Sequence, residues 1–459
     1  MIKSIGNKKK LGTLLLLFLS PLWLTSCWDK KELDQMAFVL SMGIDQSPQG
    51  LIEVTARIAV PEAIVGGGGG GGDQSTSPAE ISKVVTIAAR TIPEGFALLE
   101  ATVERRVTFT QCRTVVIGEE LVRQGLDQIL DFFNRHREFR RTLIFFMSKG
   151  SPAREIFQHA VPVLEENIAR YIEDIVDIQR QFGFSPFVRL HDLNNEMEVY
   201  HLDGLIPIMA INPEVAKEKE GTEVKPRPTS EFRADEGSVE EEVRNIPSTL
   251  HRSGGNPVSY IGAGVLVGGH LVGYMDADEV RITEIIRGRY QTGIWTFPDP
   301  MEEGKYVSVI LDQQKPVRIK VDESTDPIRI EISARLLGKL LEVQAGPYVT
   351  PEAFRFLEEA IAEELNQQAL DLIQRMQALP ADPFYLIRPL RWRTLTTKEY
   401  MALPWHEWYQ KADIVVSIQP EIEFFGFQLA PARPNPATQK LLPPETTEEE
   451  DLSGEAEWE

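Results

Sequence analysis

The side chains best suited to covalent or metal chemistry are few in this sequence. Its two cysteines, Cys27 and Cys112, cannot form a disulfide framework or a four-cysteine zinc site. The seven histidines include no pair spaced four residues apart, as helical zinc ligands are, and no Gly-x-Ser-x-Gly sequence accompanies them. We therefore expect neither an enzyme active site nor a metal site. No histidine lies near Cys112 in the sequence, so we expect this thiol to pack in the core.

Two further groups of residues resemble binding motifs only in part. The densest set of possible metal ligands matches no known ligand spacing and is interpreted as a polar surface helix. This set comprises His191, Asp192, Glu196, Glu198 and His201. Gly262 and Gly264 begin like a dinucleotide-binding loop, but the third glycine comes one residue late and no helix follows the turn. Close packing or a bulge explains these two glycines better.

Cys27 has a specific chemistry because of the residues that precede it. Residues 1–26 place four lysines and no acidic residue before the apolar run Leu11–Leu24, which is the plan of a secretory signal peptide. This run is shorter than the roughly 20 residues of a membrane-spanning helix. It ends in Leu24-Thr25-Ser26-Cys27, which looks like a bacterial lipobox. A thiolate can accept diacylglycerol as a thioether, so we expect cleavage before Cys27 and stable anchoring by its acyl chains. A chance cysteine near an ordinary cleavage site is the alternative.

Composition and charge limit the possible partners. The 459 residues allow about three domains, and 42% hydrophobic with 25% charged residues is typical of a chain that folds in water. Lys plus Arg number 48 against 69 Asp plus Glu, for a formal net charge of -21. Such a chain repels the phosphates of nucleic acids and gains nothing overall from anionic lipid. We expect no nucleic-acid partner, and a membrane attachment through lipid on Cys27, with no other cofactor.

Apolar periodicity predicts alternating strands and helices in the first half of the chain. Residues 38–60 read as a hairpin of two strands. One amphipathic helix is predicted from Glu119 to Phe133, because apolar residues recur there at three- and four-residue steps. Its basic end, Arg135–Arg141, is interpreted as a solvated last turn. The other predicted elements are strands over Lys83–Ala89, Arg113–Ile117 and Thr142–Ser148, a helix from Pro93 and a helix over Val163–Phe182.

The second half reads as a hairpin, an antiparallel meander and a long helix. The hairpin turns at Gly268-Gly269 and leads into a helix over Asp276–Arg287. The long helix starts at Pro351, and its apolar stripe from Phe354 to Leu379 is expected to lie on the meander, with docking of a partner helix as the alternative. The remaining predicted elements are strands Gly293–Phe297, Tyr306–Leu311, Val317–Val321 and Ile328–Leu336, a helix over Pro404–Ala412 and a strand over Asp413–Phe424.

These elements predict an α+β fold of three successive mixed α/β domains with largely antiparallel sheets, behind a lipoprotein signal peptide. The predicted divisions are a signal peptide 1–26, an N-terminal α/β domain 27–200, a middle domain 201–298, a C-terminal domain 299–430 and a disordered acidic tail 431–459. A glycine-rich linker, 66–78, and an acidic insertion, 213–256, interrupt the first two domains.

Five pieces of this sequence, in order, resemble the Ger(x)C family, the lipoprotein C subunits of spore germinant receptors. The first piece is the segment from Cys27 to Leu33 with the hairpin that contains Gly43-Ile44-Asp45. The others are residues 114–141, residues 262–279, Asp382-Pro383-Phe384, and Trp405 and Trp408 followed by Phe425-Gly426-Phe427.

The resemblance implies a non-enzymatic function. Such subunits sit on the outer face of the spore inner membrane with a polytopic A subunit and a transporter-like B subunit, and the complex starts germination in response to nutrients. Cys27 is then the lipidation site, and Trp28, Asp29 and Glu32 are second candidates for membrane-proximal or partner contacts.

Two other classes of lipoprotein remain as alternatives. An extracytoplasmic solute-binding lipoprotein would capture a nutrient itself, usually between two lobes with parallel sheets. A lipid-anchored cell-wall hydrolase would need a paired acid and base, which the sequence does not reveal.

Overall fold

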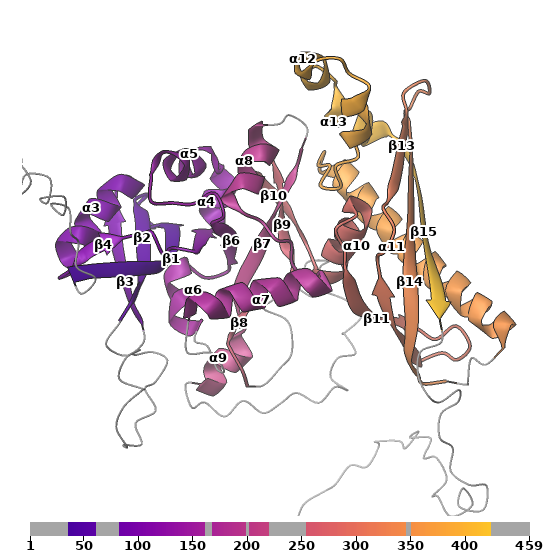
Figure 1. Ribbon diagram of the computed structural model, residues 1–459, viewed down its shortest axis with the longest axis horizontal. Coiled ribbons are helices and arrows are strands. Elements are labelled where there is room, and N and C mark those ends of the chain that lie inside the picture. The colour runs from indigo at the N-terminus through magenta and orange to yellow at the C-terminus, as the bar shows by residue number, and fades with distance from the viewer. Residues whose placement is uncertain are drawn as a thin grey trace, which may run out of the picture.

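The computed structural model describes residues 35–60, 82–160, 168–198, 202–219, 254–345 and 350–423. These residues form two β-sheets with helices packed on them, so the predicted α+β class is confirmed (Figure 1). Within these ranges no helix is both long and apolar enough to cross a membrane. The predicted signal peptide, the glycine-rich linker, most of the acidic insertion and the acidic tail lie outside the described residues.

The first sheet is mixed, with parallel strands at its centre and antiparallel strands on both sides. Its order is β10-β9-β7-β6-β5-β1-β2-β3, and β4 and β8 pair with β1 and β7. The neighbours β1, β5, β6 and β7 are parallel. The strands are β1 (Met36–Gln46), β2 (Ile52–Ala59), β3 (Ser82–Ala89), β4 (Arg106–Thr108), β5 (Thr114–Gly118), β6 (Ile144–Lys149), β7 (Gly204–Ile211), β8 (Val258–Ser259), β9 (Ala263–Val267) and β10 (His270–Met275).

Helices cover both faces of this sheet. The central strand β5 is buried along its whole length, as expected of an apolar strand covered on two sides. One core lies under α3, α4, α5 and α8, and a second lies under α6 and α7 (Figure 1). The helices of this half are α3 (Ile92–Thr102), α4 (Glu119–Gln124), α5 (Asp127–Arg135), α6 (Ala153–His159), α7 (Ile168–Phe182), α8 (Leu190–Glu198) and α9 (Pro213–Lys219).

The single helix predicted from Glu119 to Phe133 is wrong, because the chain breaks between α4 and α5. Gly125 has a φ of 116°, in the region that favours glycine, and the next N–H, of Leu126, donates to the carbonyl oxygen of Gly269 at 3.2 Å. A Cβ on Gly125 would lie 2.7 Å from the His270 ring. The turn between β9 and β10 therefore interrupts the helix, and the apolar periodicity continues across the break.

The predicted domain boundary at residue 200 does not separate two sheets. Strand β7 follows it, pairs in parallel with β6, and is joined by β9 in the same sheet. The sequence analysis placed no strand there, because Gly204–Ile211 is uniformly apolar and contains Pro207. The described part of the chain thus has two sheets, and strands assigned to the middle domain complete the first one.

The second sheet is the predicted antiparallel meander with one parallel strand added. Its order is β11-β12-β14-β13, and the last strand, β15, pairs in parallel with β14. Buried and exposed residues alternate along β11, so one face of the sheet is covered. The elements are α10 (Ala277–Arg287), β11 (Thr292–Pro298), β12 (Tyr306–Asp312), β13 (Arg318–Asp322), β14 (Arg329–Val343), α11 (Pro351–Ala378), the 3-10 helix η6 (Arg388–Trp392), α12 (Thr397–Met401), α13 (Trp405–Lys411) and β15 (Asp413–Glu423).

Helix α11 covers this sheet, as its apolar stripe predicts. The Thr350 hydroxyl caps its first turn by accepting from the Ala353 N–H, and Pro351 occupies the first position. Leu357, Ile361 and Leu365 on its stripe are buried. The interpretation of this stripe as core is therefore confirmed.

One hydrophobic cluster joins the two sheets. Leu205 on β7 and Val265 on β9 belong to the same buried cluster as Val280 on α10 and Trp295 on β11. Asp276 caps the start of α10 with a capping box. The Asp276 side chain accepts from the Glu279 N–H, and the Glu279 side chain accepts from the Asp276 N–H. This cap fixes the first turn of α10, a helix whose buried side chains belong to the core shared by the two sheets.

Candidate functional site at the junction of the two sheets

The residues chosen from the sequence as lipidation and contact sites lie outside the described residues. These are Cys27, Trp28, Asp29 and Glu32. Cys112 is described, and only 4% of its surface is exposed. Burial raises the pKa of its thiol to about 12, so it remains protonated at neutral pH. Its predicted role as a packed core residue is confirmed.

The polar set on α8 does not converge on one point. His191 is exposed beside Asn195, whereas the Asp192 carboxylate accepts from the Arg189 guanidinium at 3.1 Å. Glu196 contacts Tyr385 instead, in the segment between α11 and η6 of the second half. His201 lies outside the described residues. His191, Asp192, Glu196 and Glu198 thus belong to one helix, α8, as predicted. Glu196, however, faces the junction between the two sheets rather than the surface.

Glu196 and Tyr385 form the first polar contact between the two halves. The Tyr385 hydroxyl donates to Glu196 Oε1. The Arg287 guanidinium lies 4.1 Å from the centre of the Tyr385 ring, and its Nε donates to the carbonyl oxygen of Pro383 at 2.5 Å. Burial raises the pKa of Glu196, and the nearby Arg287 charge opposes that shift. Tyr385 has a φ of 60°, a backbone strain that these contacts must offset.

Asp382 and Trp405 form the second polar contact, within the C-terminal half. The Trp405 indole N–H donates to Asp382 Oδ2 at 3.0 Å, and both side chains are fully buried. The backbone N–H of Ile387 reaches the same oxygen at 3.4 Å. The other oxygen, Oδ1, is buried and has no hydrogen-bond partner in the part of the chain that the structure describes. Burial raises the pKa of Asp382 to about 7.

Asp203 connects this second contact to the first sheet. It precedes β7, and its Oδ2 accepts from the Asp382 backbone N–H at 2.6 Å. His406 Nε2 lies 3.1 Å from the same Asp203 oxygen. This hydrogen bond raises the pKa of His406 and outweighs the opposing effect of burial. Asp203 therefore holds the start of β7 to two separate segments of the second half.

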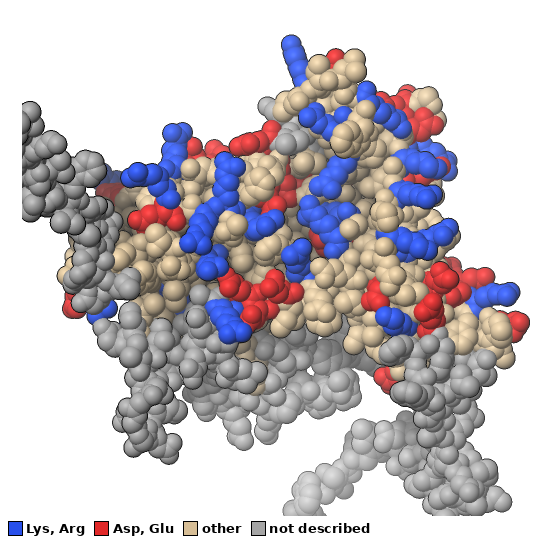
Figure 2. Space-filling view, in the orientation of Figure 1, with Lys and Arg blue, Asp and Glu red and all other residues tan. Residues whose placement is uncertain are grey.

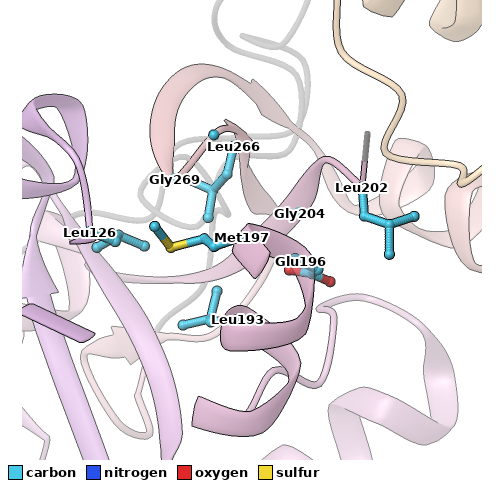
Figure 3. Close-up of a pocket in the computed structure, with 9 residues that line it drawn as sticks. Leu126, Leu193, Glu196, Met197, Leu202, Gly204, Leu266 and Gly269 are labelled. Carbon is cyan, nitrogen blue, oxygen red and sulfur yellow. The ribbon is translucent and has the colours of Figure 1, made fainter. Parts of the chain in front are cut away.

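A small pocket opens beside this junction. Its empty volume of about 220 Å³ includes space open to solvent at its mouth. Figure 3 shows Met197 between Leu126 and Glu196, with Leu193 below it and Leu266 above it. The Glu196 side chain also packs against Gly204, where a Cβ would lie 2.3 Å from its Oε2. The pocket is thus mainly apolar, with one carboxylate at its edge.

The sequence analysis missed the junction because its members are far apart in the chain. Asp203 and His406 are separated by 203 positions, and neither belongs to a recognised spacing. The available signal was the resemblance, which included Asp382 and Trp405 as separate pieces. The structure brings these two into direct contact. Chemically, the junction can bind a proton near neutral pH and hold the two sheets together.

Another motif from the resemblance proves to be structural. Asp45 lies one residue before the end of β1, and its carboxylate accepts from the Ala153 N–H at 2.9 Å, at the start of α6. A Cβ on Gly43 would lie 2.6 Å from Ala153 Cβ, so only glycine allows this approach. Similarly, a Cβ on Gly264 would lie 2.7 Å from Leu271, which confirms that close packing explains this glycine.

Comparisons with known proteins give a family match for each half of the chain. The family described as "Spore germination protein N-terminal domain" matches residues 29–211. The family described as "Spore germination B3/ GerAC like, C-terminal" matches residues 261–426. The chain belongs to the GerAC-like spore germination family. The matched ranges leave out residues 212–260, which include the whole predicted acidic insertion, 213–256.

Several GerAC-like proteins of Bacillus subtilis (strain 168) are similar to this chain. Putative spore germination protein YfkR is 22% identical over 89% of this chain and 95% of its own length. Spore germination protein B3 is 22% identical over 89% of this chain and 96% of its own length. A crystal structure of the GerBC protein, 17% identical, has a TM-score of 0.48 and covers 83% of this chain and 96% of that chain.

Proposed function

We propose that this chain is a non-enzymatic, lipid-anchored subunit of a spore germinant receptor complex. It sits on the outer face of the spore inner membrane and acts with a polytopic A subunit and a transporter-like B subunit in nutrient-triggered germination. The observation that carries this proposal is the match to the GerAC-like family over both halves, with spore germination protein B3 aligned along nearly its whole length.

The anchor in this proposal is diacylglycerol on Cys27, which the lipobox-like sequence supports. Nine positions separate Cys27 from Met36, the first residue of β1. A chain of that length spans at most about 30 Å. An anchored protein therefore keeps the start of its first sheet close to the bilayer, where subunits embedded in the membrane are accessible.

The junction supports a coupling function rather than catalysis. The Asp203 carboxylate contacts His406 and accepts a hydrogen bond from the Asp382 backbone N–H. The Glu196 carboxylate accepts a hydrogen bond from the Tyr385 hydroxyl. Such contacts make the two sheets one body that can transmit a load or a displacement between partners.

The test of the anchor is Cys27→Ala, with Cys112→Ala as the matched control. Spores carrying Cys27→Ala should incorporate no labelled palmitate into the protein and should germinate much more slowly with nutrient. The loss of tethering lowers the local concentration at the membrane by about a hundredfold or more. The Cys112→Ala protein should keep its lipid and germination rate, because Cys112 is buried away from any lipid.

Each contrary outcome overturns a different part of this proposal. Normal germination without lipid on the protein would disprove the need for an anchor, and lipid on Cys27→Ala would show that the lipobox is misplaced. Co-purification from spore membranes tests the partners: two polytopic subunits support the receptor complex. An ABC permease would instead support the solute-binding lipoprotein.

A further inference from the structure

The loop between η6 and α12 holds two large apolar side chains almost entirely in solvent. Trp392 is 91% exposed and Leu395 is 93% exposed. The other large apolar side chains exposed in the described part of the chain are only 36–51% exposed. Helix α12 lies at an outer end of the molecule, beyond α13 (Figure 1). Residues 388–401, which comprise η6, α12 and the loop between them, are called the tip below.

The contacts of the tip show that this exposure is built into the fold. The Arg393 guanidinium donates to the Val321 carbonyl oxygen at 2.9 Å and pairs with Glu323 at 2.9 Å, which fixes the tip to β13. Thr396 and Glu399 form a capping box at the start of α12. Defined contacts on both sides therefore hold Trp392 and Leu395 outward.

The charge of the tip is opposite to that of the whole chain. It contains four cations, Arg388, Arg391, Arg393 and Lys398, and one acid, Glu399, in a chain with a net charge of -21. Neither Arg391 nor Lys398 takes part in an ion pair among the described residues. Figure 2 shows Lys and Arg side chains around this end of the molecule. The tip thus presents a local positive charge that attracts an anionic surface.

We infer that the tip inserts Trp392 and Leu395 into the headgroup region of an anionic bilayer, with its cations at the level of the lipid phosphates. A Trp and a Leu flanked by Arg and Lys is the composition of interfacial membrane anchors. A protein partner needs a pocket for the indole and roughly 1,200–2,000 Å² of buried surface. The neighbours of these side chains are cations and threonines, which suit lipid headgroups better than such an interface.

This contact strengthens the proposed attachment, and it relies on the proposed function only for placing the protein at a membrane. The lipid on Cys27 would restrain one end of the chain and the tip would restrain the C-terminal half. Two attachment points would fix the orientation of the molecule on the bilayer, whereas a single tether leaves it free to rotate.

Quenching of Trp fluorescence tests this contact on the full lipidated protein. The protein is reconstituted into vesicles whose phosphatidylglycerol carries brominated acyl chains, which quench an indole they touch. Trp392→Phe should lose a quenchable component that Trp408→Phe retains, because Trp408 packs against the C-terminal core. Replacing phosphatidylglycerol by phosphatidylcholine with the same bromination should remove this difference.

The cations are tested in the same vesicles. Arg391→Gln combined with Lys398→Gln should reduce tip insertion by about fivefold for each charge removed. The matched control combines Lys83→Gln with Lys305→Gln, two exposed cations on other elements, and should leave the quenching unchanged. Palmitate incorporation, measured on the same preparation, reports on the anchor separately from the tip.

Two results would overturn the inference. One is equal quenching of wild type and Trp392→Phe in the vesicle-bound fraction. The other is a pair of findings: the wild-type Trp392 is not quenched by lipid, and the Trp392→Ser, Leu395→Ser double variant loses polytopic subunits that co-purify with the wild type. That pair would make the tip a protein-docking site.

Discussion

Asp382 is the residue through which pH should act on this protein. A free Asp carboxyl titrates near 3.9, whereas burial raises the pKa of Asp382 to about 7. Between these values the folded state holds a proton that the unfolded state has lost, so folding stability falls as pH rises. The contribution of the protonated Asp382 carboxyl to folding stability is complete below about pH 4 and absent above about pH 7. Asp45 and Asp276, with pKa values raised to about 6, act in the same direction.

Asp382→Asn should therefore reduce the loss of stability between pH 5 and pH 8. The amide keeps a carbonyl oxygen for the Trp405 N–H but cannot ionise. The urea or thermal midpoints of unfolding of wild type and variant should lie closer together at pH 5 than at pH 8. At pH 8 the stability of the variant should increase relative to that of the wild type. Asp413→Asn, at an exposed ion pair, is the control and should follow wild type. An equal pH dependence in Asp382→Asn and wild type would contradict this assignment.

At this scale, the sequence predicted the residues that act through their own local chemistry. The core position of Cys112 was predicted from its neighbours and is confirmed, whereas the lipobox-like sequence before Cys27 lies outside the described residues and stays a prediction. The pairing of Asp203 with His406 was not predictable, because a hydrogen bond between distant residues leaves no spacing to recognise. Asp382 and Trp405 were noticed as motif members, but their contact became visible only in three dimensions.

Among the elements, α13 is attached in part by a buried polar contact at its first residue. Trp405 lies at its start and buries its indole against Asp382. Trp405→Phe keeps an aromatic ring but removes the N–H, which leaves Asp382 Oδ2 with only the longer hydrogen bond from the Ile387 N–H. The cost should be about 1–3 kcal/mol in the free energy of unfolding, measured with urea.

Trp408→Phe is the matched control on the same helix. Its side chain is only partly buried, so the substitution should change the free energy of unfolding by well under 1 kcal/mol. If both variants lost the same stability, ring volume rather than the hydrogen bond would explain the effect.

Most elements were predictable because their apolar periods are regular and their ends have standard caps. Helix α11, with Thr350 and Pro351 at its start, and the strands β11 to β13 appear where the sequence places them, whereas β14 continues to Val343, beyond the predicted end at Leu336. A short helix, α9, also begins inside the predicted acidic insertion. Two further differences have tertiary causes. The break at Gly125 depends on the turn at Gly269, and β7 is recognisable only once β6 lies beside it.

At the scale of the whole molecule, the junction should make the two sheets unfold together. Tyr385→Phe removes the hydroxyl that donates to Glu196 and leaves a buried carboxyl without that partner. Calorimetry should then show a broadened or split transition, with a loss of about 1–3 kcal/mol in the free energy of unfolding. Tyr306→Phe, at an exposed tyrosine, should keep the wild-type transition. A single sharp transition in Tyr385→Phe would assign the coupling to the hydrophobic cluster alone.

The parallel pairing of β14 with β15 determines when the second sheet can be completed. Arg329 lies opposite Asp413, and the chain between the two strands contains α11, η6, α12 and α13. During synthesis, one edge of β14 therefore has no partner until residue 423 becomes available, and part of the α11 stripe lacks the strand that it packs against. Such open edges favour aggregation. A chain made from its N-terminus therefore closes this sheet last, and premature termination before β15 should yield an aggregation-prone product rather than a shortened protein that still folds.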